Sequence, residues 1–176
     1  MIRTLTAAFC IGLLAGTTSV PAAPSCTTAT EAKQVVIDRV VSRVNGEIIT
    51  QSDIRQARLL HLFPRLDAGS ADDAVRRALE NRALVLAEVR RATTPDPSAD
   101  RRAAWRRTWE SSLGSAEVLP LLQRAGMTET ALEDWCRNDL RIDDFLAERF
   151  RSVPEGERPR ETDAWIAVLR QRAGLK

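Results

Sequence analysis

Segment 40–54 places the strongest constraint on how this chain folds. It reads VVSRVNGEIITQSDI, so two short β-branched runs flank the dipeptide Asn45-Gly46. Both central residues of a type I′ turn need positive φ, and Asn-Gly adopts that turn readily. Just after the second run, Thr50 or Ser52 can cap a helix whose first turn carries Asp53. The pattern therefore predicts a β-hairpin, over 35–44 and 47–50, that leads directly into a helix.

Beyond the hairpin, apolar spacing and capping residues predict a mainly α-helical fold with five to six helices. The first helix should end at Pro64, whose ring and missing N–H cannot continue it. The later helices are expected to begin at Ser70, Ser98, Gly114, Thr128 and Thr162. Gly126 should end the fourth helix, and the fifth should extend to about residue 151. At 176 residues the chain is long enough for one domain with a hydrophobic core.

Residues 1–22 have the features of a secretory signal peptide. Arg3 precedes a short apolar run over 5–16, and small residues at 20–23 offer a cleavage site. The apolar run is too short to span a bilayer as a helix. We therefore expect export to a bacterial periplasm and no stable membrane insertion. Residues 23–34 are expected to form a flexible mature N-terminus, and 35–176 the folded domain.

Two cysteines follow the leader, Cys26 and Cys136, in a compartment where disulfides persist. They could pair with each other. Alternatively, Cys26 could carry a lipid anchor, although residues 23–25 match a lipobox poorly. The chain has 26 basic and 24 acidic side chains, and Arg3 belongs to the leader, so the remainder is close to neutral. It lacks the charge footprint of a nucleic-acid-binding domain.

The sequence offers little catalytic machinery. His61 is the only histidine, and it lies in an apolar stretch with no nucleophile motif nearby, so a structural role is favoured. No zinc-ligand spacing or nucleotide-binding motif occurs. The acid pairs Asp72/Asp73 and Asp143/Asp144 are adjacent within helices, so their members point in different directions. We therefore expect a protein that is not an enzyme and needs no metal or other cofactor.

The best candidate binding residues are aromatic. Trp105 and Trp109 are i, i+4 neighbours on one predicted helix face, and arginines alternate with them. A rigid aromatic pair beside guanidinium groups could bind aromatic-rich peptide segments by apolar burial and cation–π contact. The competing interpretation is that both tryptophans pack on neighbouring helices while the arginines are solvated. The candidate peptide-binding set is Trp105, Trp109, Leu113, Arg102 and Arg106.

Segment 38–54 resembles the opening of the N-terminal chaperone domain of SurA-type periplasmic chaperones, in which a similar Val-Asn-Gly signature precedes the first helix. The resemblance continues through four further stretches, in the family's order. These are ALENRALVLAE (78–88), LLQRAGMT (121–128), WCRNDL (135–140) and WIAVLRQRA (165–173). It covers about residues 36–173. It implies that the C-terminal helix returns to complete the single domain that the hairpin opens.

The chain departs from this family between its last two helices. The family usually inserts one or two parvulin-type prolyl isomerase domains there, whereas this chain has only the connector 153–161. The resemblance therefore implies an ATP-independent holdase for unfolded secreted and outer-membrane proteins, without isomerase activity. Two alternatives stay open: an envelope adaptor that binds one dedicated protein partner, and a residual prolyl isomerase. The sequence does not indicate an oligomeric state.

Overall fold

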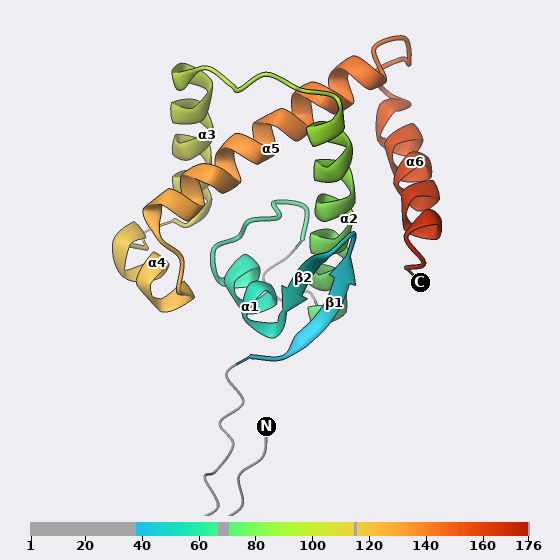
Figure 1. Cartoon of the computed structure of the whole chain (residues 1–176). Coiled ribbons are helices and arrows are strands. Elements are labelled where there is room, and N and C mark those ends of the chain that lie inside the picture. The colour runs from blue at the N-terminus through green and yellow to red at the C-terminus, as the bar shows by residue number, and fades with distance from the viewer. Residues whose placement is uncertain (1–37, 67–70, 115, 176) are drawn as a thin grey trace, which may run out of the picture. The chain divides into compact units, whose positions relative to one another are not determined.

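A computed structural model describes residues 38–66, 71–114 and 116–175. Within these ranges the chain forms one two-stranded antiparallel sheet and six helices (Figure 1). The predicted mainly helical fold is therefore confirmed. The predicted leader, the predicted flexible segment and Cys26 lie outside the described residues. The elements are β1 (Val40–Val44), β2 (Glu47–Thr50), α1 (Gln51–Leu59), α2 (Asp72–Arg91), α3 (Ala99–Ser112), α4 (Val118–Ala125), α5 (Glu129–Arg149) and α6 (Arg158–Arg172).

The hairpin has the turn and the cap that its sequence predicts. Asn45 and Gly46 have φ of 48° and 88°, the positive values that a type I′ turn needs. Thr50 caps α1 through a capping box. Its hydroxyl accepts the Asp53 backbone N–H at 3.3 Å, and the Asp53 carboxylate accepts the Thr50 backbone N–H at 2.7 Å. The strand therefore passes into the helix without a loop.

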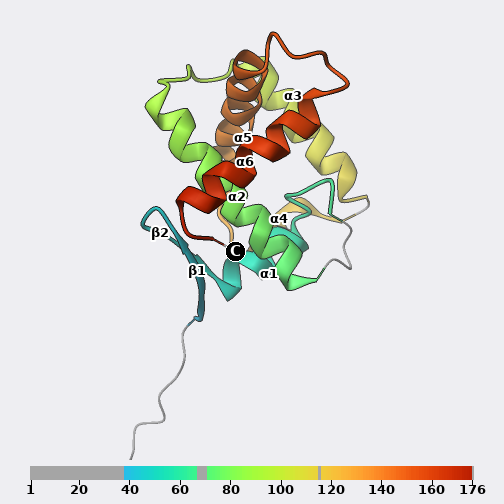
Figure 2. The same ribbon diagram turned by 90° about the vertical axis from the view of Figure 1, so that its right-hand side faces the viewer.

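Helix α2 is the central element of the compact unit formed by residues 36–176. The hairpin, α1, α5 and α6 all pack against it. Figures 1 and 2 both show the hairpin beside α2, with the C-terminal end of α6 close by. A buried cluster joins these elements, with Trp165 of α6 packed against it; its members are Val44, Ile49, Ala83, Leu84 and Leu169. The C-terminal helix thus returns to the hairpin, as expected.

A second buried cluster lies among α1, α3, α4 and the start of α5. Leu60, Leu122 and Leu132 are its most buried leucines, and Trp109 is also a member. Thr128 and Ser98 cap α5 and α3 through their side chains, as predicted. Gly126 ends α4 in the left-handed conformation, with φ of 68°, also as predicted. This cluster positions the face of α3 that carries the tryptophans.

The first helix ends earlier than predicted, at Leu59 rather than just before Pro64. His61 adopts φ of 48°. Its backbone N–H donates to the Arg58 carbonyl at 3.2 Å, and that of Leu62 donates to the Ala57 carbonyl at 3.0 Å. These two bonds form a Schellman motif, which usually has glycine at the left-handed position. The prediction was wrong because histidine occupies that position here.

The last helix begins earlier than predicted, at Arg158, so Thr162 lies inside α6 and does not cap it. The backbone N–H of Glu157 donates to the Pro154 carbonyl at 2.9 Å, and this turn leads into the helix. Pro159 sits in the first helical turn, where a missing N–H costs nothing. The connector is therefore shorter than the predicted 153–161. Helix α2 has Ala71 at its N-cap with no side-chain bond, and the predicted cap Ser70 lies outside the described residues.

Candidate functional site

A hollow of about 280 Å³ opens where α3 packs against α5. We call it the Trp105 groove. Apolar atoms form most of its exposed lining. Three of the five candidate peptide-binding residues line it, namely Trp105, Arg102 and Arg106. The other residues of the lining are Ala103, Leu132, Glu133 and Cys136.

The two tryptophans stack on each other but occupy different environments. Their ring centroids are 6.1 Å apart and their planes differ by 9°. Trp109 is buried, and its indole N–H donates to the Leu60 carbonyl at 2.7 Å. Trp105 is half-buried, and its indole N–H donates to the Asp139 carboxylate at 3.3 Å. The inner ring therefore supports the outer one, and only Trp105 lines the groove.

Internal contacts hold both candidate arginines in place. Arg106 pairs with Glu110 at 2.6 Å and with Glu129 at 2.8 Å, and its guanidinium lies 5.3 Å from the centre of the Trp109 ring. The hydrogen bond from Arg106 lowers the pKa of the Glu129 carboxyl. Arg102 donates to the Pro97 carbonyl at 2.6 Å. The groove thus has a rigid polar rim in which two carboxylates offset the charge of Arg106.

Leu113 does not join this groove. It is half-buried and packs against the core cluster that contains Trp109. Helix α5 supplies Leu132, Glu133 and Cys136 to the opposite wall, a contribution that the sequence did not predict. The spacing of Leu132 and Cys136 at i, i+4 marks one face of α5. It does not indicate which helix that face meets.

Cys136 is buried at the wall of the groove and forms no disulfide with another described residue. Its sulfur lies 3.8 Å from the Arg102 carbonyl, which accepts its weak hydrogen bond. Burial raises the pKa of this thiol, so the unreactive protonated form is favoured. Because Cys26 lies outside the described residues, a disulfide between the two cysteines stays a prediction.

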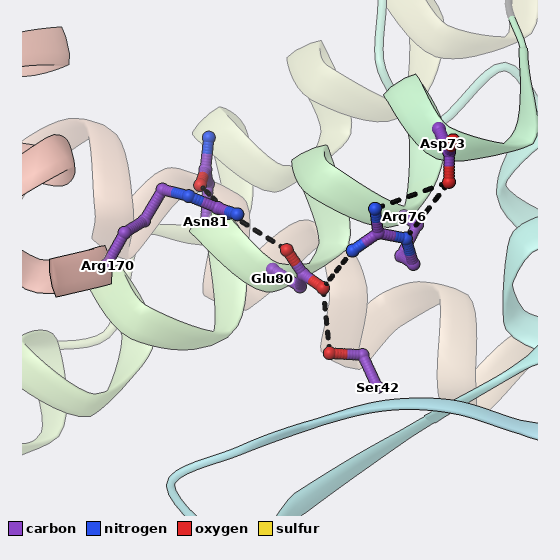
Figure 3. A network of polar contacts seen from close by, with 6 residues as sticks. All are labelled: Ser42, Asp73, Arg76, Glu80, Asn81 and Arg170. Carbon is purple, nitrogen blue, oxygen red and sulfur yellow. Dashed lines mark hydrogen bonds and ion pairs between the residues drawn. The ribbon is translucent and has the colours of Figure 1, made fainter. Parts of the chain in front are cut away.

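The buried carboxylate of Glu80 links α2 to β1 and α6 (Figure 3). Glu80 is 1% exposed. It accepts hydrogen bonds from the Ser42 hydroxyl of β1 at 2.7 Å, from Arg76 of α2 at 2.6 Å and from Arg170 of α6 at 2.9 Å. We call these four residues the Glu80 network. The i, i+4 spacing of Arg76 and Glu80 is visible in the sequence, whereas the partners from β1 and α6 lie far away along the chain.

The Glu80 network makes stability depend on pH. Burial alone would raise the pKa of Glu80, but hydrogen bonds from one hydroxyl and two guanidinium groups outweigh burial and lower it. A carboxyl whose pKa is lower in the folded state stabilises the fold above its unfolded pKa, about 4.3 for glutamate. This contribution is lost as the pH falls through the folded-state value.

We therefore expect the free energy of unfolding to fall below about pH 4.3 more steeply in the native protein than in Glu80→Gln. Denaturant unfolding of both proteins at a series of pH values measures this difference. Subtracting the two curves removes the shared effects of other acids, such as Asp139 and Asp143, whose pKa values burial raises. Parallel curves through the acid range would show that Glu80 does not cause the dependence.

The other candidate polar residues form no catalytic constellation. His61 is exposed at the edge of a hollow of about 720 Å³ between α1 and α4, most of whose lining residues are polar. Asp72 pairs with Arg58 at 2.7 Å, and Asp144 pairs with Arg101 at 2.7 Å. Within 38–66, 71–114 and 116–175, no three His, Cys, Asp or Glu side chains lie close enough together to hold a metal ion. In the same ranges, no helix is both long and apolar enough to cross a bilayer.

Comparisons with protein families, with characterised proteins and with solved structures give no match to this chain. Its function is therefore inferred from its own residues and from the geometry described above.

Proposed function

We propose that this chain is a periplasmic, ATP-independent chaperone that holds unfolded secreted and outer-membrane proteins without catalysing a reaction. The resemblance of segment 38–54 to SurA-type chaperones supports this proposal. So does the return of α6 to the hairpin, because the same arrangement is expected of that family's N-terminal domain. A cleaved leader would account for the periplasmic location.

One observation carries the proposal, the position of Trp105. Its ring lines an apolar groove, and the stacked Trp109 ring and the bond to Asp139 hold it from behind. A rigid aromatic side chain loses little conformational entropy when it binds a partner. The groove is also small, so it suits single apolar or aromatic side chains of an extended segment better than a folded surface. A holdase needs this kind of weak, repeated contact.

The direct test uses the mature protein and a denatured outer-membrane protein diluted into buffer. We expect near-stoichiometric amounts of the mature protein to suppress aggregation of this client, as followed by light scattering. Trp105→Ala should weaken client binding by about 1–2 kcal/mol, roughly 5–30-fold in Kd, because it removes the indole that lines the groove. Ala103→Gln should also weaken binding, since it fills the groove from an exposed helical position without removing a core side chain.

Leu119→Ala is the matched control, because Leu119 is a 58% exposed apolar side chain on α4 outside the groove. It should bind the client as the native protein does. A mature protein that neither slows aggregation nor binds the client contradicts the proposal. Capture of one folded envelope protein, without binding to unfolded clients, would identify the adaptor function instead.

A further inference from the structure

A second, smaller cavity is lined by Trp135 of α5 and by residues of the hairpin, α1 and α2. Its volume is about 140 Å³, and β2, α1, α2 and α5 all contribute to its walls. Leu79, Ala83 and Ile49 supply apolar surface, while Ile48, which is 48% exposed, also lines it. A cavity of about this size can hold a ligand of about six heavy atoms. We call it the Arg82 cavity.

Two residues that line this cavity each have a buried hydrogen-bond donor without an acceptor. Among the described residues, only three buried side-chain nitrogens lack a hydrogen-bond partner, and two belong to residues that line the Arg82 cavity. They are Nε of Arg82 and Nε1 of Trp135. The Arg82 side chain is 10% exposed, and its guanidinium stacks 3.7 Å from the centre of the Trp135 ring. Buried donors without acceptors are costly, so two in one cavity call for a ligand that accepts from both.

The protein's own contacts hold the Arg82 guanidinium in place but leave its Nε without a hydrogen-bond acceptor. Its Nη2 donates to the Trp135 carbonyl at 3.1 Å. Asp139 lies 3.4 Å from Nε, close enough for an ion pair but without the geometry of a hydrogen bond, and Asp139 also accepts from Trp105. Burial lowers the pKa of Arg82, although Asp139 and Glu47 act in the opposite direction. Asp139 therefore supplies the counter-charge of Arg82, while Nε keeps no hydrogen-bond partner.

The acids in the cavity wall do not replace the missing acceptor. The Asp53 carboxylate already accepts the backbone N–H and the hydroxyl of Thr50 in the capping box. Glu47 is exposed at the hairpin turn, where water solvates its charge. The planar guanidinium and the indole N–H therefore remain as donors for a planar ligand group that accepts hydrogen bonds through its oxygens.

We propose that the Arg82 cavity binds a carboxylate group, with Arg82 and Trp135 as its donors. Two kinds of ligand carry such a group: a small free carboxylic acid and a peptide with a free terminal carboxylate. The site is separate from the Trp105 groove and does not depend on the proposed chaperone function. Asp139 contacts both Trp105 and Arg82, so the two sites share one half-buried acid.

The test follows the indole N–H resonances of the four tryptophans of the full mature protein by NMR. Sodium acetate is titrated against sodium chloride at constant ionic strength, and acetamide serves as the neutral isostere. We expect acetate to shift the Trp135 resonance saturably, while acetamide shifts it far less. The Trp109 resonance should stay in place because its N–H is already bonded to Leu60. Acetyl-dialanine with a free or an amidated C-terminus then separates the two kinds of ligand.

Arg82→Lys keeps the positive charge but removes Nε and the planar fork, so acetate affinity should fall at least about tenfold. Trp135→Phe keeps a ring against Arg82 and removes only the indole donor. Saturation transfer to acetate measures its binding, and the remaining indole resonances report its fold. The proposal is overturned if acetate shifts the Trp135 resonance no more than the Trp109 resonance, or if chloride or acetamide shifts the Trp135 resonance as strongly as acetate. It is also overturned if both folded variants bind acetate as tightly as the native protein.

Discussion

Replacing Glu80 with alanine is expected to lower the free energy of unfolding by about 3–5 kcal/mol. Its carboxylate is 1% exposed, and it is the common acceptor for Ser42, Arg76 and Arg170. Removing it leaves two guanidinium groups that are only 27% and 12% exposed without their shared counter-charge. It also removes a polar link from α2 to β1 and α6, so the loss should appear first as opening of the hairpin and the C-terminal helix.

Denaturant unfolding gives the size of this loss, and hydrogen exchange of the hairpin and α6 amides gives its location. Asp73→Ala is the matched control, because Asp73 pairs with the same Arg76 but is 87% exposed. It should cost less than about 1 kcal/mol. Equal losses in the two variants would mean that burial of the Glu80 network contributes nothing beyond an ordinary surface ion pair.

Replacing Trp109 with alanine should also lower the free energy of unfolding by about 3–5 kcal/mol, because a buried indole leaves a large cavity in the core. Among the described residues, the Trp109 indole N–H is the only side-chain donor to the Leu60 carbonyl, and the change removes it. Trp109→Phe keeps most of the apolar volume and loses the hydrogen bond, so a smaller loss of about 1–3 kcal/mol is expected.

Thermal and denaturant unfolding of Trp109→Ala and Trp105→Ala distinguish the two stacked rings. Trp105 is half-buried and carries the exposed face of the pair, so its alanine variant should unfold at a clearly higher denaturant concentration than Trp109→Ala. The opposite order, with Trp105→Ala the less stable, would show that Trp105 is the core residue and would remove it from the groove.

Local chemistry made much of the fold predictable. The type I′ turn at Asn45-Gly46, the caps at Thr50, Ser98 and Thr128, and the left-handed end at Gly126 each depend on residues within a few positions. Two predicted helix ends were wrong because a different residue from the expected one marks the end. His61 replaces the glycine of a Schellman motif, and Pro159 rather than Thr162 marks the first turn of α6.

The candidate site was only partly predictable, because it depends on contacts between distant segments. The i, i+4 spacing places Trp105 and Trp109 on one face of α3, but it cannot indicate which of them meets the Leu60 carbonyl at the end of α1. The opposite wall of the Trp105 groove comes from α5, and the partners of Glu80 come from β1 and α6. Sequence spacing within one helix carries no information on these long-range pairs.

The central claim is that unfolded clients bind at the Trp105 groove, and residue-specific photo-crosslinking tests it most directly. The crosslinker would replace Ala103 or Glu133, which are exposed and line the groove, or Leu119 or His61, which are exposed elsewhere. With a denatured outer-membrane protein as the client, we expect strong crosslinks from 103 and 133 and only background from 119 and 61. Equal crosslinking from all four positions, or crosslinks confined to 119 and 61, would contradict the account.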